Sequence, residues 1–394
     1  MEKVRIQDDL YTHVNQETLD QLVIPDDKPT AGGFAVLADG VEKLMMDEFN
    51  EMSASGNYPN DYLKRAVTLF NLAGDAKRKA RHGIKPALKN LSILAKIKDV
   101  KAFGRYYKEL KLRRIPVPFD LDVDTDMKNT ERHCVMISGP GVILPDASYY
   151  KEEMAGQRDA LLAMWSNIAK AILAQTDLTA EEQELYLNDT LAFDRALAAV
   201  VKTREEWSNY IKAYNPMKTS RVATMLKTAG FRRVLKDLFG ELPETVIVAE
   251  PRFFKAFTSI FNQDTFEQYK HWAYVTGLYG SCSLLSEELR DLGGAFMRAL
   301  SGIAAGTPIN KFAYQLASQM YSEPVGLYYG EKYFGEEAKK DITDIVNQII
   351  DTYKSRIEKN DILGPETKEK AILKLSTMGV KMGYPDKVQE IYDK

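Results

Sequence analysis

Apolar side chains recur at helical spacing along most of this chain of 394 residues. The clearest stripe runs through 342–357 and consists of Ile342, Ile345, Val346, Ile349, Ile350, Tyr353 and Ile357. Steps of three and four residues place such side chains on one face of an amphipathic helix. The sequence therefore predicts a mainly α fold, in which these stripes form the core between helices rather than a cofactor site.

Signals at the helix ends agree with this interpretation. Thr179 followed by Glu182 is typical of a capping box, which satisfies free backbone N–H groups at the start of a helix. Gly364-Pro365 ends one helix and begins another, because proline is tolerated in a first helical turn. A further stripe consists of Leu161, Trp165, Ile168 and Ile172.

The period changes between residues 116 and 145. The alternating run Phe119-Asp120-Leu121-Asp122-Val123-Asp124-Thr125-Asp126 is followed by Lys128-Asn129, which is a turn signal, and then by an apolar stretch. Alternation with a period of two predicts β-strands. We therefore expect a small β-hairpin at 119–137. Its aspartates should face solvent, while Phe119, Leu121 and Val123 should face inward.

The same acidic run also resembles a calcium loop. Five carboxylates occupy the ligand positions of such a loop: Asp120, Asp122, Asp124, Asp126 and Glu131. However, Thr125 stands where the sharp turn of a calcium loop needs glycine, and Pro116 and Pro118 oppose an entering helix. These departures favour the hairpin over a calcium site.

Charge and composition exclude several classes of protein. Hydrophobic residues make up 45% and the net charge is -3, so the chain is neither mostly disordered nor globally attracted to nucleic acid or anionic membranes. One segment, 77–114, holds 14 Lys and Arg against Asp99 and Glu109. The favoured interpretation is solvated helix faces that pair with acidic surface, and a nucleic-acid patch is the weaker alternative. We expect no nucleic-acid partner.

Motifs for catalysis are absent from the sequence. The four histidines, His13, His82, His133 and His271, include no pair at the spacing that brings two imidazoles to one zinc ion. A nucleophilic pair of cysteine and histidine stays open, but no pattern marks one. The first residues show no signal peptide and no apolar stretch is long enough to cross a bilayer, so we expect a cytoplasmic protein without membrane contact. Export by another route stays open as the alternative.

Motifs in a fixed order along the chain resemble the neprilysin-type zinc metallopeptidases, in particular the bacterial oligopeptidase O branch. They are Asp9-Leu10-Tyr11-Thr12-His13-Val14-Asn15, Ile24-Pro25, Gly32-Gly33-Phe34, Leu144-Pro145-Asp146, Tyr214-Asn215, Tyr321-Ser322-Glu323-Pro324-Val325-Gly326 and Lys381-Met382-Gly383-Tyr384-Pro385-Asp386. No single motif is diagnostic, but their joint order is specific.

The resemblance implies a protein of two lobes around a cavity. One lobe is thermolysin-like and carries the zinc motif, and the other is a helical cap that restricts entry to peptides. By resemblance, 1–30 packs on the catalytic lobe, 31–380 forms the cap, and 381–394 links to the catalytic lobe. The zinc ligands should follow this segment, so we expect no zinc bound to this chain and no catalytic residue in it.

By the same resemblance, part of the substrate site lies here. Phe34, with Gly32 and Gly33, matches the family segment that lines the pocket for the residue after the scissile bond. A core aromatic at a lobe junction is the alternative for Phe34. Animal relatives carry arginines that bind the carboxyl end of the peptide, whereas the matching positions here are Thr30 and Ala38. This departure argues against selectivity that depends on that carboxylate.

The resulting hypothesis is the substrate-gating, N-terminal part of a zinc metalloendopeptidase that hydrolyses oligopeptides. Its partners would be an oligopeptide and the catalytic lobe. The alternative is a non-catalytic module that binds a protein partner. Apolar side chains from Val23 to Phe34 and from Val380 to Tyr384 have no obvious partner in the cap, so we also expect an exposed apolar face that favours self-association.

Overall fold

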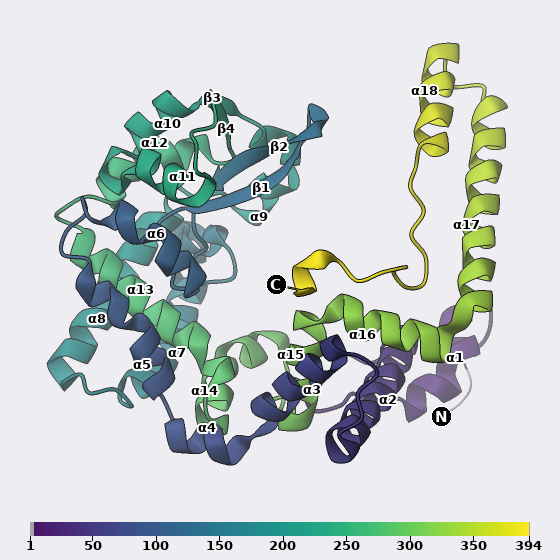
Figure 1. Ribbon diagram of the computed structural model, residues 1–394, viewed down its shortest axis with the longest axis horizontal. Coiled ribbons are helices and arrows are strands. Elements are labelled where there is room, and N and C mark those ends of the chain that lie inside the picture. The colour runs from purple at the N-terminus through teal and green to yellow at the C-terminus, as the bar shows by residue number, and fades with distance from the viewer. Residues whose placement is uncertain (1–3, 394) are drawn as a thin grey trace. The chain divides into compact units, whose positions relative to one another are not determined.

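The computed structural model describes residues 4–393, and helices dominate it (Figure 1). The chain divides into two compact units. The continuous unit is Lys77–Gly306, and the split unit combines the described residues of Met1–Ala76 and Thr307–Lys394. The mainly α prediction is confirmed. The predicted boundaries at residues 30 and 380 depend on the catalytic lobe that the resemblance implies, so they stay predictions.

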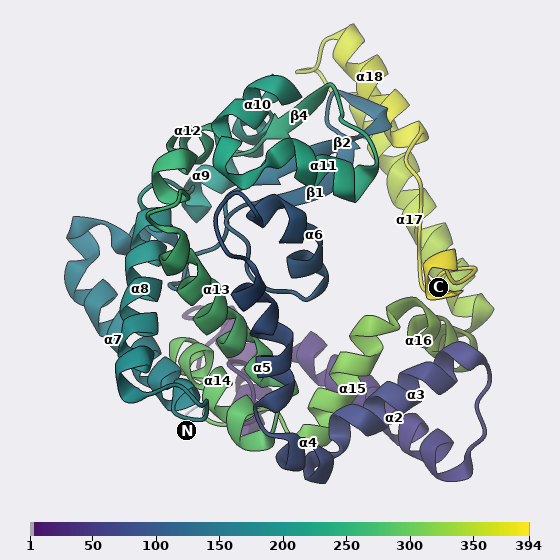
Figure 2. The same cartoon turned by 60° about the vertical axis from the view of Figure 1, so that its left-hand side comes forward.

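The continuous unit holds most of the helices and all four strands. Its helices are α4 (Ala76–His82), α5 (Lys85–Leu91), α6 (Phe103–Leu112), α7 (Ala155–Leu173), α8 (Ala180–Ala198), α9 (Arg204–Ser208), α10 (Thr219–Met225), α11 (Phe231–Phe239), α12 (Pro251–Ile260), α13 (Phe266–Ser281) and α14 (Glu287–Ser301). Short 3₁₀ turns are Ser92–Lys96, Ala147–Tyr150, Glu152–Met154, Tyr210–Ala213, Lys227–Ala229 and Cys282–Leu284. Figure 2 shows α13 lying beside α8 and α5.

An aromatic core fills this unit. Its largest fully buried side chains are Tyr107, Tyr269, Phe103, Phe119, Phe193, Phe231, Phe253, Phe254, Phe257, Phe261 and Phe266. Many of these rings meet edge to face, which is the arrangement that aromatic quadrupoles favour. The core thus joins α6, α12 and α13 with the start of the first strand.

A four-stranded mixed sheet contains the predicted hairpin. Strands β1 (Asp120–Asp126) and β2 (Asn129–Ser138) pair antiparallel, β4 (Thr245–Val248) pairs parallel with β2, and β3 (Pro216–Lys218) pairs antiparallel with β4. The hairpin prediction is confirmed. The two further strands were not predicted from the sequence.

Two side-chain assignments in the hairpin were wrong. Val123 is 51% exposed rather than inward, and Asp126 is 1% exposed rather than facing solvent. The register shifts between Thr125 and Asp126, which turns the Asp126 carboxylate toward Tyr214 and Arg132. Hydrogen bonds from the Tyr214 hydroxyl and the Lys128 N–H lower the pKa of Asp126 to about 2. The last aspartate of the run is therefore a structural anchor.

The split unit has a smaller core assembled from two distant segments. Its helices are α1 (Leu10–Gln21), α2 (Gly33–Ser55), α3 (Asp61–Gly74), α15 (Ile309–Met320), α16 (Ser322–Tyr329), the π-turn Gly330–Phe334, α17 (Gly335–Glu358) and α18 (Pro365–Ser376), with a final 3₁₀ turn at Glu390–Asp393. Phe49 of α2 lies at the centre, edge to face with Phe70 of α3 and Tyr314 of α15. Figure 1 shows α18 running back beside α17.

Several local predictions are confirmed at named positions. The 342–357 stripe lies on α17, and the Leu161–Ile172 stripe lies on α7. The expectation that the 342–357 stripe forms core was wrong, because α17 buries no residue and Ile345, Ile349 and Tyr353 are about half exposed. Thr179 caps α8 with both bonds of the capping box, and Pro365 opens α18. These signals act within one helix, so neighbouring units do not alter them.

Candidate functional site

The predicted substrate segment lies at the start of α2 in the split unit. Gly33 is the first residue of this helix, and Gly32 caps it without a side-chain hydrogen bond. Phe34 is 91% exposed, so it is not part of either hydrophobic core. A Cβ atom at Gly32 or Gly33 would meet no atom within 4 Å. The three residues therefore form an open, exposed helix start.

An ion pair fixes the segment that leads into α2. Lys311 of α15 donates to the Asp27 carboxylate at 2.8 Å, and its Nζ is 3.8 Å from the Glu42 carboxylate on α2. The hydrogen bond from Lys311 lowers the pKa of Asp27. Lys311 thus positions the approach to Phe34. Sequence reasoning missed this residue because it lies far from Phe34 along the chain.

A second polar cluster ties α2 to the π-turn. The carboxylate of Glu48 accepts hydrogen bonds from the hydroxyls of Tyr328 and Tyr333 and from Lys332 Nζ at 2.6 Å. Burial opposes ionisation of Glu48, but these three donors together lower its pKa to about 2. The cluster contains a fully paired carboxylate, which is suited to holding structure rather than to accepting a proton.

The two apolar stretches expected to lack a partner, 23–34 and 380–384, differ in the structure. Val23 and Ile24 are exposed, as expected. Tyr384, in contrast, lies edge-on to Phe334, with 6.3 Å between ring centroids, and under Lys339 Nζ at 4.4 Å. Its ring occupies the space beside Gly330, where a Cβ atom would clash. The expectation that Tyr384 lacks a partner was wrong.

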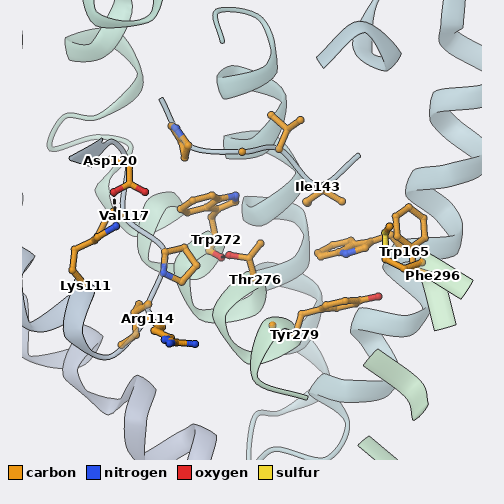
Figure 3. A pocket seen from close by; sticks show the side chains of 17 residues that line it. Lys111, Arg114, Val117, Asp120, Ile143, Trp165, Trp272, Thr276, Tyr279 and Phe296 are labelled. Carbon is orange, nitrogen blue, oxygen red and sulfur yellow. Dashed lines mark hydrogen bonds and ion pairs between the residues drawn. The ribbon is translucent and has the colours of Figure 1, made fainter. Parts of the chain in front are cut away.

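The continuous unit contains a pocket of about 570 Å³ (Figure 3). We call it the tryptophan pocket, because two of the three tryptophans of the chain line it. Its lining residues are Lys111, Arg114, Ile115, Pro116, Val117, Asp120, Pro140, Gly141, Val142, Ile143, Trp165, Trp272, Thr276, Tyr279, Gly280, Phe296 and Met297. Figure 3 shows Lys111 and Arg114 at one end, Trp165, Tyr279 and Phe296 at the other, and Trp272 with Thr276 between them.

The loop at 139–143 on the pocket wall is held by two buried carboxylates. Glu250 accepts from the Gly139 N–H at 2.6 Å, and Asp194 accepts from the Ile143 N–H at 2.9 Å. The Tyr150 hydroxyl also donates to Asp194. Burial raises the pKa of Asp194 to about 6, although these hydrogen bonds oppose the shift. Burial raises the pKa of Glu250 as well.

The four histidines and two cysteines do not gather at one site within the described residues. His13 Nδ1 is 2.6 Å from the Val4 carbonyl oxygen, and His271 Nδ1 is 2.6 Å from the Asp189 carboxylate. His133 and Cys134 are neighbours in β2, and Cys282 is buried in the core of the continuous unit. Within residues 4–393, no group of three or more His, Cys, Asp or Glu side chains is placed to hold a metal ion.

Some basic residues of the segment 77–114 form ion pairs with acidic side chains. Lys79 Nζ is 3.5 Å from Glu287, Arg113 pairs with Glu109 at 2.7 Å, and Lys111 pairs with Asp120. These pairs agree with the favoured interpretation of the segment. The absence of a nucleic-acid partner stays a prediction.

Comparisons with known proteins establish the family. The sequence model described as Peptidase family M13 matches residues 6–385. The neutral endopeptidase of Lactococcus lactis subsp. lactis strain IL1403 is 35% identical over 394 residues, which cover 99% of this chain and 62% of that protein. The chain therefore belongs to peptidase family M13, as the resemblance predicted.

Solved structures agree with this assignment. The crystal structure of PepO from Lactobacillus rhamnosis HN001 superposes with a TM-score of 0.91 at 30% identity and covers 99% of this chain and 61% of that one. The Mycobacterium tuberculosis zinc metalloprotease Zmp1, solved in complex with an inhibitor, superposes with a TM-score of 0.86 at 24% identity. This match covers 98% of this chain and 59% of that one, and it supports the fold alone. The chain spans about three fifths of these proteins and matches their N-terminal portion.

The family uses zinc, and the residues present here do not fit that ion. A zinc site needs three or four converging nitrogen, sulfur or oxygen ligands, and the described residues offer no such group. No zinc-dependent step is therefore assigned to them. Separately, none of the described helices has both the length and the apolar character to cross a membrane.

Proposed function

We propose that this chain is the substrate-gating part of a zinc metalloendopeptidase that hydrolyses oligopeptides. The observation that carries the proposal is the match along the whole chain to the N-terminal portion of PepO. The described residues contain no metal-ligand group, so their contribution would be selection and binding of the peptide. In the complete enzyme, zinc would polarise the scissile carbonyl and activate a water molecule.

A chimera tests this proposal. The portion of the Lactococcus lactis neutral endopeptidase that this chain does not cover is fused after Lys394. We expect cleavage of short peptides that a chelator abolishes. The same portion without this chain is the control, and it should lose the preference for short over long peptides. A folded chimera without peptidase activity would contradict the proposal.

The alternative is a non-catalytic module that binds a protein partner. Exposed apolar side chains at Val23, Ile24 and Phe34 favour it to a limited extent, because such surface is often a contact site. This alternative would be supported if the folded chimera showed no peptidase activity and bound a protein partner saturably. The self-association that we expect from the same face would appear as a concentration-dependent mass in solution.

We further propose that Phe34 contacts the substrate residue after the scissile bond. Its exposure at the start of α2 supports this role, because the ring is free to meet a ligand. In the chimera, Phe34→Ala should lower kcat/KM about tenfold for peptides with a large apolar residue at that position. Leu37→Ala, a matched change at a residue that is 67% exposed, should leave kcat/KM unchanged. Equal effects of the two changes would remove Phe34 from the substrate site.

A further inference from the structure

The tryptophan pocket combines an apolar interior with one charged end. Trp165, Trp272 and Phe296 are each less than 5% exposed, and the Trp165 and Tyr279 rings stack with 5.5 Å between centroids. The volume of about 570 Å³ is within the range of small-ligand sites. These surfaces favour a flat or bulky apolar group.

The charged end carries a net positive charge. The charged residues among those that line it are Lys111, Arg114 and Asp120. Lys111 and Asp120 pair with each other. In the part of the chain that the structure describes, the Arg114 guanidinium has no hydrogen-bond or ion-pair partner. An anionic group of a ligand would therefore meet an unneutralised cation.

The backbone at Arg114 is strained. With φ at +54°, it is the one non-glycine among residues 4–393 in the left-handed region. Arg114 follows the end of α6, where the Ile115 N–H bonds the Leu110 carbonyl at 2.9 Å. Glycine is the usual residue at this position of such a helix end. Strain of this kind is concentrated at binding sites, and here it holds an arginine at the pocket end.

Tyr279 carries a polar group at the aromatic end of the pocket that has no protein partner in the described part of the chain. The Tyr279 hydroxyl is buried and makes no hydrogen bond within the described residues. A buried hydroxyl without a partner is costly, and a polar ligand atom would satisfy it. The pocket thus offers a cation at one end and a free donor at the other, with aromatic rings between them.

We propose that the tryptophan pocket binds the C-terminal residue of an oligopeptide, with the α-carboxylate at Arg114 and an aromatic side chain among Trp272, Trp165 and Tyr279. The proposal rests on the proposed function, because it takes peptides as the ligands of the protein. It assigns a second peptide contact, which is in the continuous unit, whereas Phe34 belongs to the split unit. The carboxylate contact would be at Arg114 instead of at the positions of Thr30 and Ala38, and it would select peptides with a free, aromatic C-terminal end.

Tryptophan fluorescence measures binding directly. Trp165 and Trp272 line the pocket, and Trp207 lies outside it. The probe is N-acetyl-alanyl-phenylalanine, which contains no tryptophan. Three comparison ligands separate its features: the C-terminal amide, N-acetyl-alanyl-alanine, and 3-phenylpropionate as a free aromatic acid. We expect the probe to change the tryptophan fluorescence saturably. Each comparison ligand should bind at least tenfold more weakly.

Matched variants identify the cation. Arg114→Asn removes the charge with a residue that tolerates positive φ, and it should weaken binding of the probe at least tenfold. Arg105→Gln removes an exposed charge from α6 outside the pocket and should leave binding unchanged. Gly280→Leu is an independent block, because a Cβ atom there meets nothing within 4 Å and the position lines the pocket. It should also abolish binding.

Each contrary outcome overturns the proposal. If the amide binds as tightly as the probe, the pocket does not recognise the α-carboxylate. If 3-phenylpropionate binds as tightly as the probe, the pocket is a site for free aromatic acids and not for peptides. Unchanged binding in both Arg114→Asn and Gly280→Leu places the ligand elsewhere. The titration uses the chain without a catalytic portion, so its failure is distinct from failure of the peptidase chimera.

Discussion

The two units of the chain differ in how completely they bury their apolar side chains. The continuous unit encloses a contiguous aromatic core drawn from one stretch of sequence. The split unit has a smaller core, and its helices α1, α17 and α18 bury no residue. Exposed apolar side chains of α17 include Ile345, Ile349 and Tyr353. A stripe at helical spacing therefore predicts an amphipathic helix, but it does not predict whether the apolar face of that helix is buried.

The largest effect should come from the core of the continuous unit. Phe103 is fully buried and packs against Phe261 with 4.9 Å between ring centroids. Phe103→Ala should lower the free energy of unfolding by about 3–5 kcal/mol, because it removes buried area and leaves a cavity. Urea denaturation measures this loss. A loss below about 1 kcal/mol would show that the aromatic core is not tightly packed.

The next effect concerns pH and the buried carboxylate beside the pocket. The pKa of Asp194 is raised to about 6, so the folded state holds its proton more tightly than the unfolded chain does. This contribution to stability is fully present below the ordinary carboxyl pKa and is lost as pH rises through about 6. Asp194→Asn should reduce the change of stability with pH over this range. Thermal melts between pH 4 and 7 check it, and an unchanged slope in the variant would contradict the assignment.

The Glu48 cluster in the split unit should give a pH dependence of stability opposite in sign to that of Asp194. The pKa of Glu48 is lowered to about 2 in the folded state, from an ordinary pKa of 4.5. Its contribution to stability is therefore fully present above pH 4.5 and is lost as pH falls toward 2. Glu48→Gln should cost about 1–2 kcal/mol at neutral pH, since charge-assisted hydrogen bonds from Lys332 and two tyrosines weaken. Denaturation at pH 7 and pH 3 measures both values. A cost that is equal at both pH values would exclude the ionic contribution.

The smallest effect should be at Phe34. Phe34→Ala should change the stability of this chain by less than about 0.5 kcal/mol, because the ring is 91% exposed. Urea denaturation beside Phe103→Ala gives a matched comparison of the same substitution in the two units. A loss similar to that of Phe103→Ala would instead favour the alternative that Phe34 is a core aromatic.

How far the sequence predicted the fold depended on the range of the interactions. The capping box of Thr179 and the helix predicted from the 342–357 stripe depend on local sequence, and both are confirmed. The core position expected for that stripe was wrong, because burial depends on neighbouring surfaces. Strand β4 was missed because Thr245–Val248 is too short for its period to separate strand from helix. Its partner β2 lies far back along the chain. Asp126 was misplaced because alternation cannot predict a register shift.

The candidate sites show the same limit. Phe34 was found through resemblance, whereas its ion-paired support at Lys311 joins two distant segments and has no local signal. The tryptophan pocket collects residues from 111–120, 140–143, 165, 272–280 and 296–297. Trp165 was assigned to a helix core from its spacing alone, and this spacing cannot distinguish a core from a pocket wall.

Zinc content tests most directly whether the bond-making chemistry lies outside this chain. The purified chain is dialysed against zinc, its metal is quantified, and peptide cleavage is assayed with and without chelator. We predict no tightly bound stoichiometric zinc and no chelator-sensitive cleavage, because no described group of side chains can hold the ion. One tight zinc per chain, with cleavage that the chelator removes, would contradict a substrate-gating role without chemistry of its own.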